Sequence, residues 1–350
     1  METKRLSYLD AARGLGILLV IFGHSFRPAM RAAVPWCETA YQFVYRFHVP
    51  LLFMLSGICY EHTAHKNHSL HCWQYLRKRS RQLLRPWFSY SVLIYVLFAL
   101  VQLIPPCQKL LAQSGYQLLS PLAYGQAMLR NENPYSFHLW YLQTLFLFTS
   151  TRFFLDKWVS PKTVRRVLWG LLFLSPAFYQ LFCLELSWGG KAFFQQMGYF
   201  SLGCILAKTR WKRYAPALVC LGAAGGLWLL AAPQFAAAKN GPLAALYLER
   251  LAAAGLCCGI LAGCFLLQDR IGPLARFGRR SMVYYLYHQP FCCGFAGLVL
   301  YDKLHIRSGA TVFLCMWVSL FLPDLFCFAV RQTGLGSGLT ALGLPWEKEG

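Results

Sequence analysis

The stretch LDAARGLGILLVIFGHSF, residues 9–26, reads as a membrane-spanning helix that carries Asp10, Arg13 and His24. Charged and titratable side chains are costly in hydrocarbon and therefore normally face the interior of a helix bundle. Arg13 and His24 are eleven residues apart, about three helical turns, so both lie on one face. Asp10 shares that face, which predicts an ion pair with Arg13. The rise from Arg13 to His24 is about 16 Å, about half of the hydrocarbon thickness.

Two interpretations of His24 stay open on this spacing alone. It is either an interior histidine with satisfied polar contacts or a proton-transfer group, for which imidazole is well suited near neutral pH. Gly14, Gly16 and Gly23 lie on the same segment, and small residues of this kind predict close approach by another helix or by a ligand.

The composition of the whole chain agrees with a membrane protein. Of 350 residues, 57% are hydrophobic and 13% are charged, against about 25% charged in soluble domains. The net charge of +21 does not indicate a nucleic-acid partner, because the basic residues lie in short clusters between apolar runs. The fourteen cysteines show no C-x-x-C or paired zinc spacing, so neither a disulfide framework nor a metal site is expected.

Apolar runs of about 20 residues predict an all-α, polytopic integral membrane protein with about ten transmembrane helices. With the N-terminus inside, 23 of the 34 Lys and Arg fall on the cytoplasmic side. This asymmetry predicts that both termini are cytoplasmic. We expect one membrane-embedded domain over residues 1–335, a short cytoplasmic tail over 336–350, and a re-entrant or interfacial helix within 105–136. The expected spans are 7–27, 41–60, 83–104, 137–155, 164–184, 192–208, 214–232, 243–267, 281–301 and 309–330.

Two further segments carry polar groups at the expected second and third spans. In FHVPLLFMLSGICY (47–60), His48 and Ser56 differ by about 80° in azimuth and could border one cavity, or the segment is a Pro-bent packing helix. In YLRKRSRQLLRPW (75–87), Arg77, Arg81 and Arg85 form a stripe, with Arg79 on another side. Guanidinium groups bind phosphate well, but simple anchoring at the cytoplasmic interface would also place them there.

Two later segments add aromatic and histidine side chains. FHLWYL (137–142) contains His138, Trp140 and Tyr141. Trp140 and Tyr141 fit an interfacial aromatic belt and could also stack on a sugar. RRSMVYYLYHQPF (279–291) places His288 eight residues into a span, about 12 Å deep, where it could face a buried cavity.

Together these segments resemble acyltransferase family 3, the membrane-integral acyltransferases, over essentially the whole chain. The family's R-x10-H is matched by Arg13 and His24, and its F-H-x-P-L-x-F-x-x-S-G segment by FHVPLLFMLSG. Its R-x-R entry to the third span is matched by Arg79 and Arg81. HLWYL (138–142) and S-x-x-x-Y-L-x-H (281–288) also fit, and the HLWYL form is most similar to the fucose O-acetylase-like branch.

This resemblance implies a multi-pass protein of a cell membrane, the bacterial plasma membrane, that moves an acetyl or other acyl group from cytoplasmic acyl-CoA to a carbohydrate hydroxyl. The acceptor would be a cell-surface or exopolysaccharide sugar or a lipid-linked glycan, with acetyl-CoA as donor substrate and no permanently bound cofactor. His24 would be the catalytic base or a transient acyl carrier, and Arg13, held by Asp10, would assist it. We expect Arg79 and Arg81, with Arg77 or Arg85, to bind the CoA phosphates, and His48, Ser56, His138, Trp140 and His288 to line the acceptor side.

Two other classes of function remain open at this stage. A transporter or flippase for a glycan or an anionic substrate would use the intramembrane His and Arg residues as its pathway. A membrane sensor would keep the fold without catalysis, although the complete set of Arg13, His24, Arg79 and Arg81 argues for activity. The sequence does not indicate the acceptor sugar, the length of the acyl group or the oligomeric state.

Overall fold

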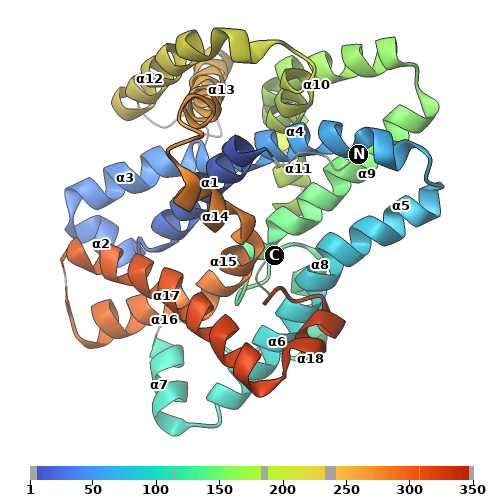
Figure 1. Ribbon diagram of the computed structural model, residues 1–350. Coiled ribbons are helices and arrows are strands. Elements are labelled where there is room, and N and C mark those ends of the chain that lie inside the picture. Colours follow the sequence, from blue (N-terminus) through green and yellow to red (C-terminus); the bar gives the residue numbers. More distant parts are fainter. Residues whose placement is uncertain (1–5, 114, 183–187, 233–241, 307, 347–350) are drawn as a thin grey trace.

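A computed structural model describes residues 6–113, 115–182, 188–232, 242–306 and 308–346. Every regular element in these ranges is a helix (Figure 1). Lys4, Arg5, Lys239, Arg307 and Lys348, which enter the charge count, lie outside the described residues, as do residues 347–350 of the expected tail.

The first half of the chain contains α1 to α9. Their bounds are α1 (Ser7–His24), α2 (Pro28–Ala33), α3 (Pro35–Tyr45), α4 (His48–His68), α5 (Cys72–Arg79), the π-helical η1 (Ser80–Leu84), α6 (Arg85–Val101), α7 (Pro105–Gln113), α8 (Pro121–Leu129), the 3-10 turn η2 (Phe137–Leu139) and α9 (Trp140–Trp158).

The second half contains α10 to α18. Their bounds are α10 (Pro161–Phe182), α11 (Trp188–Leu206), η3 (Trp211–Tyr214), α12 (Ala215–Ala231), α13 (Leu243–Leu266), α14 (Gly272–Arg279), α15 (Ser281–Tyr287), the π-helical η4 (His288–Cys292), α16 (Cys293–Gly297), the π-helical η5 (Leu298–Lys303), α17 (Ala310–Thr333) and α18 (Gly336–Leu342).

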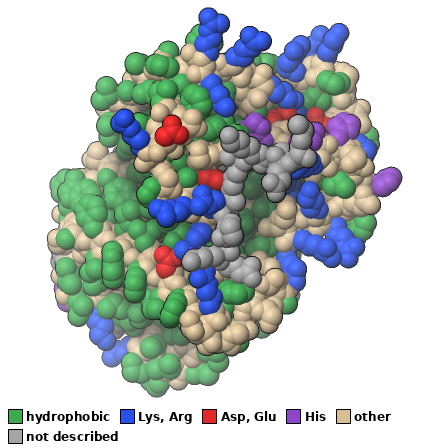
Figure 2. All heavy atoms as spheres, in the orientation of Figure 1, with side chains coloured by type: hydrophobic (Ala, Val, Ile, Leu, Met, Phe, Trp, Pro, Cys, Tyr) green, Lys and Arg blue, Asp and Glu red, His purple; other side chains and the backbone are tan. Residues whose placement is uncertain are grey.

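Five helical stretches among the described residues are long and apolar enough to cross a membrane. The expected number of ten spans, and the side on which the termini lie, stay predictions. On the face in Figure 2, hydrophobic side chains cover much of the left and lower parts, whereas many Lys and Arg side chains lie along the upper margin and on the right. The five stretches are Pro35–His68, Cys72–Val101, Trp211–Ala231, Leu243–Leu266 and Ala310–Thr333.

Helix α1, which carries the polar face, lies in the middle of the assembly and contacts α3, α4, α13, α14, α15, α16 and α17 (Figure 1). The glycines predicted to allow close approach do so. A Cβ on Gly14 would lie 2.5 Å from the Leu274 carbonyl oxygen of α14, and one on Gly23 would lie 3.0 Å from the Tyr45 ring. Helices α4 and α11 meet in the same way, since a Cβ on Gly57 would lie 2.2 Å from the Phe200 carbonyl oxygen. Backbones can approach this closely only where no side chain intervenes.

Two expected spans are interrupted in the structure. The segment 41–60 is divided between α3 and α4, because the helix ends at Tyr45 and restarts at His48. The segment 281–301 is divided into four short elements. Proline disfavours helical backbone in the residue before it, and Gln289, which precedes Pro290, is extended at φ −128° and ψ 149°. Tyr90 donates a hydrogen bond of 2.5 Å to the Gln289 carbonyl oxygen.

The connection 105–136 forms two short helices, α7 and α8, where one re-entrant or interfacial helix was expected. Tyr124 and Tyr135 of this connection are buried in the same hydrophobic cluster as Tyr90 and Leu139, which precede and follow it in the chain. The connection is therefore part of the packed bundle around the region where α9 begins.

Candidate functional site

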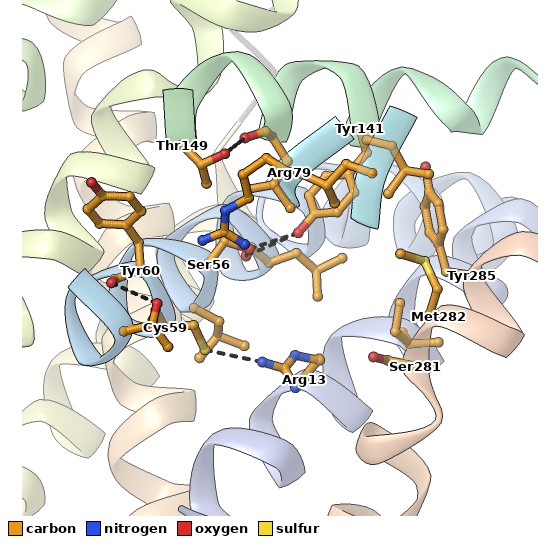
Figure 3. Close-up of a pocket in the computed structure, with 17 residues that line it drawn as sticks. Arg13, Ser56, Cys59, Tyr60, Arg79, Tyr141, Thr149, Ser281, Met282 and Tyr285 are labelled. Atoms are coloured by element: carbon orange, nitrogen blue, oxygen red, sulfur yellow. Dashed lines mark hydrogen bonds between the residues drawn. The ribbon is translucent and has the colours of Figure 1, made fainter. Parts of the chain in front are cut away.

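A cavity of about 270 Å³ lies between α1, α4, α9 and α15, and we call it the arginine cavity. Arg13 of α1 and Arg79 of α5 enter it from different helices (Figure 3). Two positive side chains that converge on one cavity suit an anionic ligand. Its other lining residues include Ser56, Cys59, Tyr60, Tyr141, Ser281, Met282 and Tyr285.

Arg13 is held in place from two sides. Its guanidinium group forms the ion pair with Asp10 that the sequence predicts, at 3.1 Å, and also lies 3.1 Å from the Cys59 sulfur. The Asp10 side chain is only 7% exposed. A buried carboxylate of this kind both compensates the cation and fixes its direction. Asp10 is thus placed to position Arg13, while the guanidinium faces the cavity.

The four arginines of residues 77–85 do not act as one group. Arg79 is half-buried in the arginine cavity, where its Nε donates to the Tyr75 hydroxyl at 3.2 Å. Arg77, Arg81 and Arg85 are exposed and do not line that cavity. The chain changes from α-helix to π-helix directly after Arg79, and π-helical turns often occur at functional sites.

Ser56, which is expected on the acceptor side, lines the arginine cavity. Its hydroxyl donates to the Leu52 carbonyl oxygen at 2.8 Å and lies 2.9 Å from the Tyr141 hydroxyl. Tyr141 in turn packs 5.6 Å from the Tyr285 ring, measured between ring centroids. Ser56 and Tyr141 thus form a polar part of the cavity wall beside Tyr285.

The far end of α1 carries a cluster of three histidines from three distant parts of the sequence. The ring centroid of His24 lies 5.3 Å from that of His288, which lies 4.9 Å from that of His138. His138 and His288 are 3% and 0% exposed, whereas His24 is half-buried. The structure therefore brings two of the predicted acceptor-side residues to the predicted catalytic histidine.

Hydrogen bonds orient the rings in and around this cluster. Nδ1 of His288 bonds to the carbonyl oxygens of Tyr284 and Tyr285 at 3.0 and 2.8 Å. Because a carbonyl only accepts, Nδ1 must carry the proton, which leaves Nε2 as the acceptor of the neutral ring. The Tyr45 hydroxyl lies 3.2 Å from Nδ1 of His24, and the His48 ring packs 4.8 Å from the Tyr45 ring. His48 therefore adjoins the cluster through Tyr45, on a different side of α4 from Ser56.

Tyr285 stands between the arginine cavity and the histidine cluster. Its ring lines the cavity, and its hydroxyl donates to the His138 carbonyl oxygen at 2.5 Å. The Tyr285 and His288 ring centroids are 6.4 Å apart. Tyr285 therefore adjoins both the arginine cavity and the histidine cluster.

Trp140, the remaining acceptor-side candidate, packs 6.0 Å from the Phe53 ring. The aromatic ring that does contact His24, besides Tyr45, is Phe137, at 5.1 Å between centroids. Phe137 is 49% exposed and occupies the first position of the quoted segment FHLWYL. It covers one side of the His24 ring.

Sequence reasoning missed Tyr45, Cys59 and Tyr285, and it considered Tyr141 for an aromatic belt or for stacking on a sugar. Tyr45 lies three residues before His48, and Tyr285 stands inside the quoted segment YYLYH. Sequence reasoning also missed a buried ionic group beside the cavity, in which Arg152 bonds to Glu61 at 2.6 Å and to Asp156. Tyr60, which lines the cavity, donates to Asp156 at 3.0 Å. These ionic and hydrogen-bonded contacts hold α4 and α9 together beside the cavity.

The fold and the site define a helical membrane protein with a cationic cavity at one end of a central helix and histidines at the other. A sequence model of the acyltransferase domain of acyltransferase family 3 matches residues 6–328, and the chain belongs to that family. No curated protein matches it. No solved structure matches it either. The protein is therefore a membrane acyltransferase in general terms.

Proposed function

We propose that this protein transfers an acetyl group from acetyl-CoA to a hydroxyl of a carbohydrate, with His24 at the reacting centre. The observation that carries the proposal is that cationic side chains and histidines meet at opposite ends of α1. Arg13 faces a cavity that also holds Arg79, and His24 meets His288 eleven residues further along the same helix. A long donor with anionic phosphates at one end and a thioester at the other matches this arrangement.

In this proposal the donor enters the arginine cavity from the cytoplasmic side. Guanidinium groups make charge-assisted hydrogen bonds to phosphate, which favours Arg79 and Arg13 as the phosphate contacts. Arg77 and Arg81 are exposed outside the cavity, and their part is to attract the anion and to anchor the helix at the interface. The pantetheine arm then extends past Tyr285 toward His24.

The transfer itself needs a base for the acceptor hydroxyl. Nε2 of His24 removes the hydroxyl proton as the acceptor oxygen attacks the thioester carbonyl carbon, and the CoA thiolate leaves and takes that proton. In the alternative route, Nε2 of His24 attacks the thioester carbonyl carbon and the CoA thiolate leaves, which gives an acetyl-imidazolium; the acceptor oxygen then attacks the acetyl carbon, Nε2 leaves as the neutral imidazole, and the CoA thiolate takes the hydroxyl proton. In both routes the imidazole becomes positively charged, and the Tyr45 oxygen can accept from Nδ1–H, 3.2 Å away.

The acceptor lies on the opposite side of Tyr285 from the donor. His138, His288 and Phe137 surround His24 there, and His48 approaches through Tyr45. Neutral imidazoles both donate and accept hydrogen bonds, and an aromatic ring can pack on the apolar face of a sugar. These groups support a carbohydrate acceptor, either a cell-surface polysaccharide or a lipid-linked glycan.

The test compares cell-envelope glycans from cells with the wild-type protein, with His24→Ala and with the control His65→Ala, an exposed histidine at the end of α4. Mass spectrometry of the glycans reports the acetyl groups, and immunoblotting of membranes reports protein level. His24→Ala should lower acetylation at least about 100-fold, as loss of a general base does, with protein level unchanged. An active His24→Ala protein would refute the assignment, and altered export of unmodified glycan would point to a transporter.

A further inference from the structure

A second cavity, of about 390 Å³, lies between the start of α15 and the C-terminal segment, and we call it the tryptophan cavity. Arg279 and Arg280 line one side, and Thr340 and Trp346 line the other. Met282 lines this cavity and the arginine cavity alike, so the two are adjacent. The residues of the tryptophan cavity play no part in the site described above, apart from this shared methionine.

The C-terminal wall of this cavity is a packed structure, although the segment was expected to be a short tail. The chain turns at Gly343, whose φ of +72° is one that glycine adopts without strain. Leu344 then inserts into the hydrophobic core and is 1% exposed. Trp346 donates from Nε1 to the Thr340 hydroxyl at 2.9 Å. Its ring lies over Gly336, where a Cβ would be 2.1 Å from the indole.

The opposite wall is cationic. Arg280 is paired with Asp324 at 2.5 Å, and Arg279 precedes it at the end of α14. The side chain of Arg85 also reaches this segment, because a Cβ on Gly343 would lie 3.0 Å from its Cδ atom. Two guanidinium groups, those of Arg279 and Arg280, thus line the cavity, and that of Arg85 lies beside its C-terminal wall. Guanidinium groups suit phosphate, and an indole face suits stacking on a base.

We propose that the tryptophan cavity binds the nucleotide half of CoA, its adenosine 3′,5′-bisphosphate part. The adenine packs against Trp346, and Arg279 contacts the 3′-phosphate. This inference rests on the proposed donor, acetyl-CoA. It deepens that proposal, because the pantetheine arm of the same CoA molecule lies in the adjacent arginine cavity. The C-terminal segment, which the family match at residues 6–328 does not include, then becomes part of donor recognition.

The first experiment measures binding of adenosine 3′,5′-bisphosphate to the full-length, detergent-solubilised protein by calorimetry. Trp346→Ala should weaken binding about tenfold, the effect of one lost base-stacking contact. Trp158→Ala, on an indole that is 70% exposed at the end of α9, should leave it unchanged. Gly336→Ala should also weaken binding, because the added Cβ displaces the Trp346 ring without removing it.

Two substitutions on α14 that each remove one positive charge test the phosphate contact. Arg279→Ala should weaken binding of adenosine 3′,5′-bisphosphate, whereas Arg276→Ala, which removes the same charge from an exposed position, should not. Equal weakening by both would mean a general electrostatic attraction, and would overturn the assignment. Binding that anionic phospholipid displaces but free CoA does not would show that the cavity holds a lipid headgroup, and would also overturn it.

The second experiment separates this inference from the proposed function by comparing two acetyl donors. Trp346→Ala should raise KM for acetyl-CoA about tenfold and leave kcat/KM for S-acetylpantetheine, which has no nucleotide, unchanged. An equal loss with both donors would refute the nucleotide site and leave acetyl transfer intact. If the wild-type protein used neither donor and bound no CoA, the proposed function itself would fail.

Discussion

The contact between Tyr45 and His24 gives the sharpest test of how His24 works. Tyr45→Phe removes one hydroxyl, 3.2 Å from Nδ1 of His24, and leaves the ring that packs against Gly23 and His48. If the imidazole becomes charged during transfer, that hydrogen bond is to a charged group and contributes about 1.5–3 kcal/mol. If the imidazole stays neutral, it contributes only about 0.5–1.5 kcal/mol.

These two ranges translate into distinct kinetic losses. Because the hydrogen bond is already present before the reaction, only its gain in strength on charging, about 1–1.5 kcal/mol, lowers the barrier. The charged case therefore predicts that kcat falls about 5- to 13-fold in Tyr45→Phe, and the neutral case predicts that kcat stays unchanged. KM for acetyl-CoA should be unchanged in both cases, because Tyr45 does not line the arginine cavity. Acetyl transfer by the purified, detergent-solubilised protein gives both constants.

The matched control is Tyr95→Phe, which removes a hydroxyl that donates to the Leu119 carbonyl oxygen, away from His24. Its kcat should stay within about twofold of the wild-type value, the smallest effect expected for a lost neutral hydrogen bond. A Tyr45→Phe protein with kcat within the same limit would refute the reasoning. So would a rise in KM with kcat unchanged, because that result would assign Tyr45 to donor binding.

Two more predictions concern the packing of α1 and the arginine cavity. Gly278→Ala should lower the melting temperature, because its Cβ would lie 1.8 Å from the Asp10 carbonyl oxygen and overpacking costs about 1–3 kcal/mol. Gly272→Ala, with no atom within 4 Å, is the control, and equal melting temperatures would contradict this packing. Cys59, which lines the cavity, should react more slowly with N-ethylmaleimide when CoA is present. Peptide mass spectrometry measures this with Cys72 as the internal reference, and unchanged labelling of Cys59 would place the donor elsewhere.

The residue spacing within single segments was enough to predict several local features. The helical period placed Asp10, Arg13 and His24 on one face, and the Asp10–Arg13 pair is present at 3.1 Å. The same period separated Arg79 from Arg77, Arg81 and Arg85, and only Arg79 lines the arginine cavity. The quoted motifs were sufficient for the family, which the match over residues 6–328 confirms. These features follow from helix geometry and side-chain type, which are local properties.

The site itself depends on contacts between distant segments. His24, His138 and His288 meet only because the helices that follow His138 and precede His288 pack near the end of α1. Ser56 and His48 belong to one helix but adjoin different parts of the site, because Tyr141 and Tyr45 approach α4 from different neighbours.

Sequence alone therefore determined a membrane protein of this family with a polar face on its first helix. Tertiary structure decided that Tyr285 adjoins both the arginine cavity and the histidine cluster, and that residues of the segment 336–346 line a second cavity. The physical reason is that the helical period fixes which side of a helix a residue occupies. Which neighbour covers that side depends on close packing among side chains far apart in the chain, and on breaks such as the one at Gln289 and Pro290.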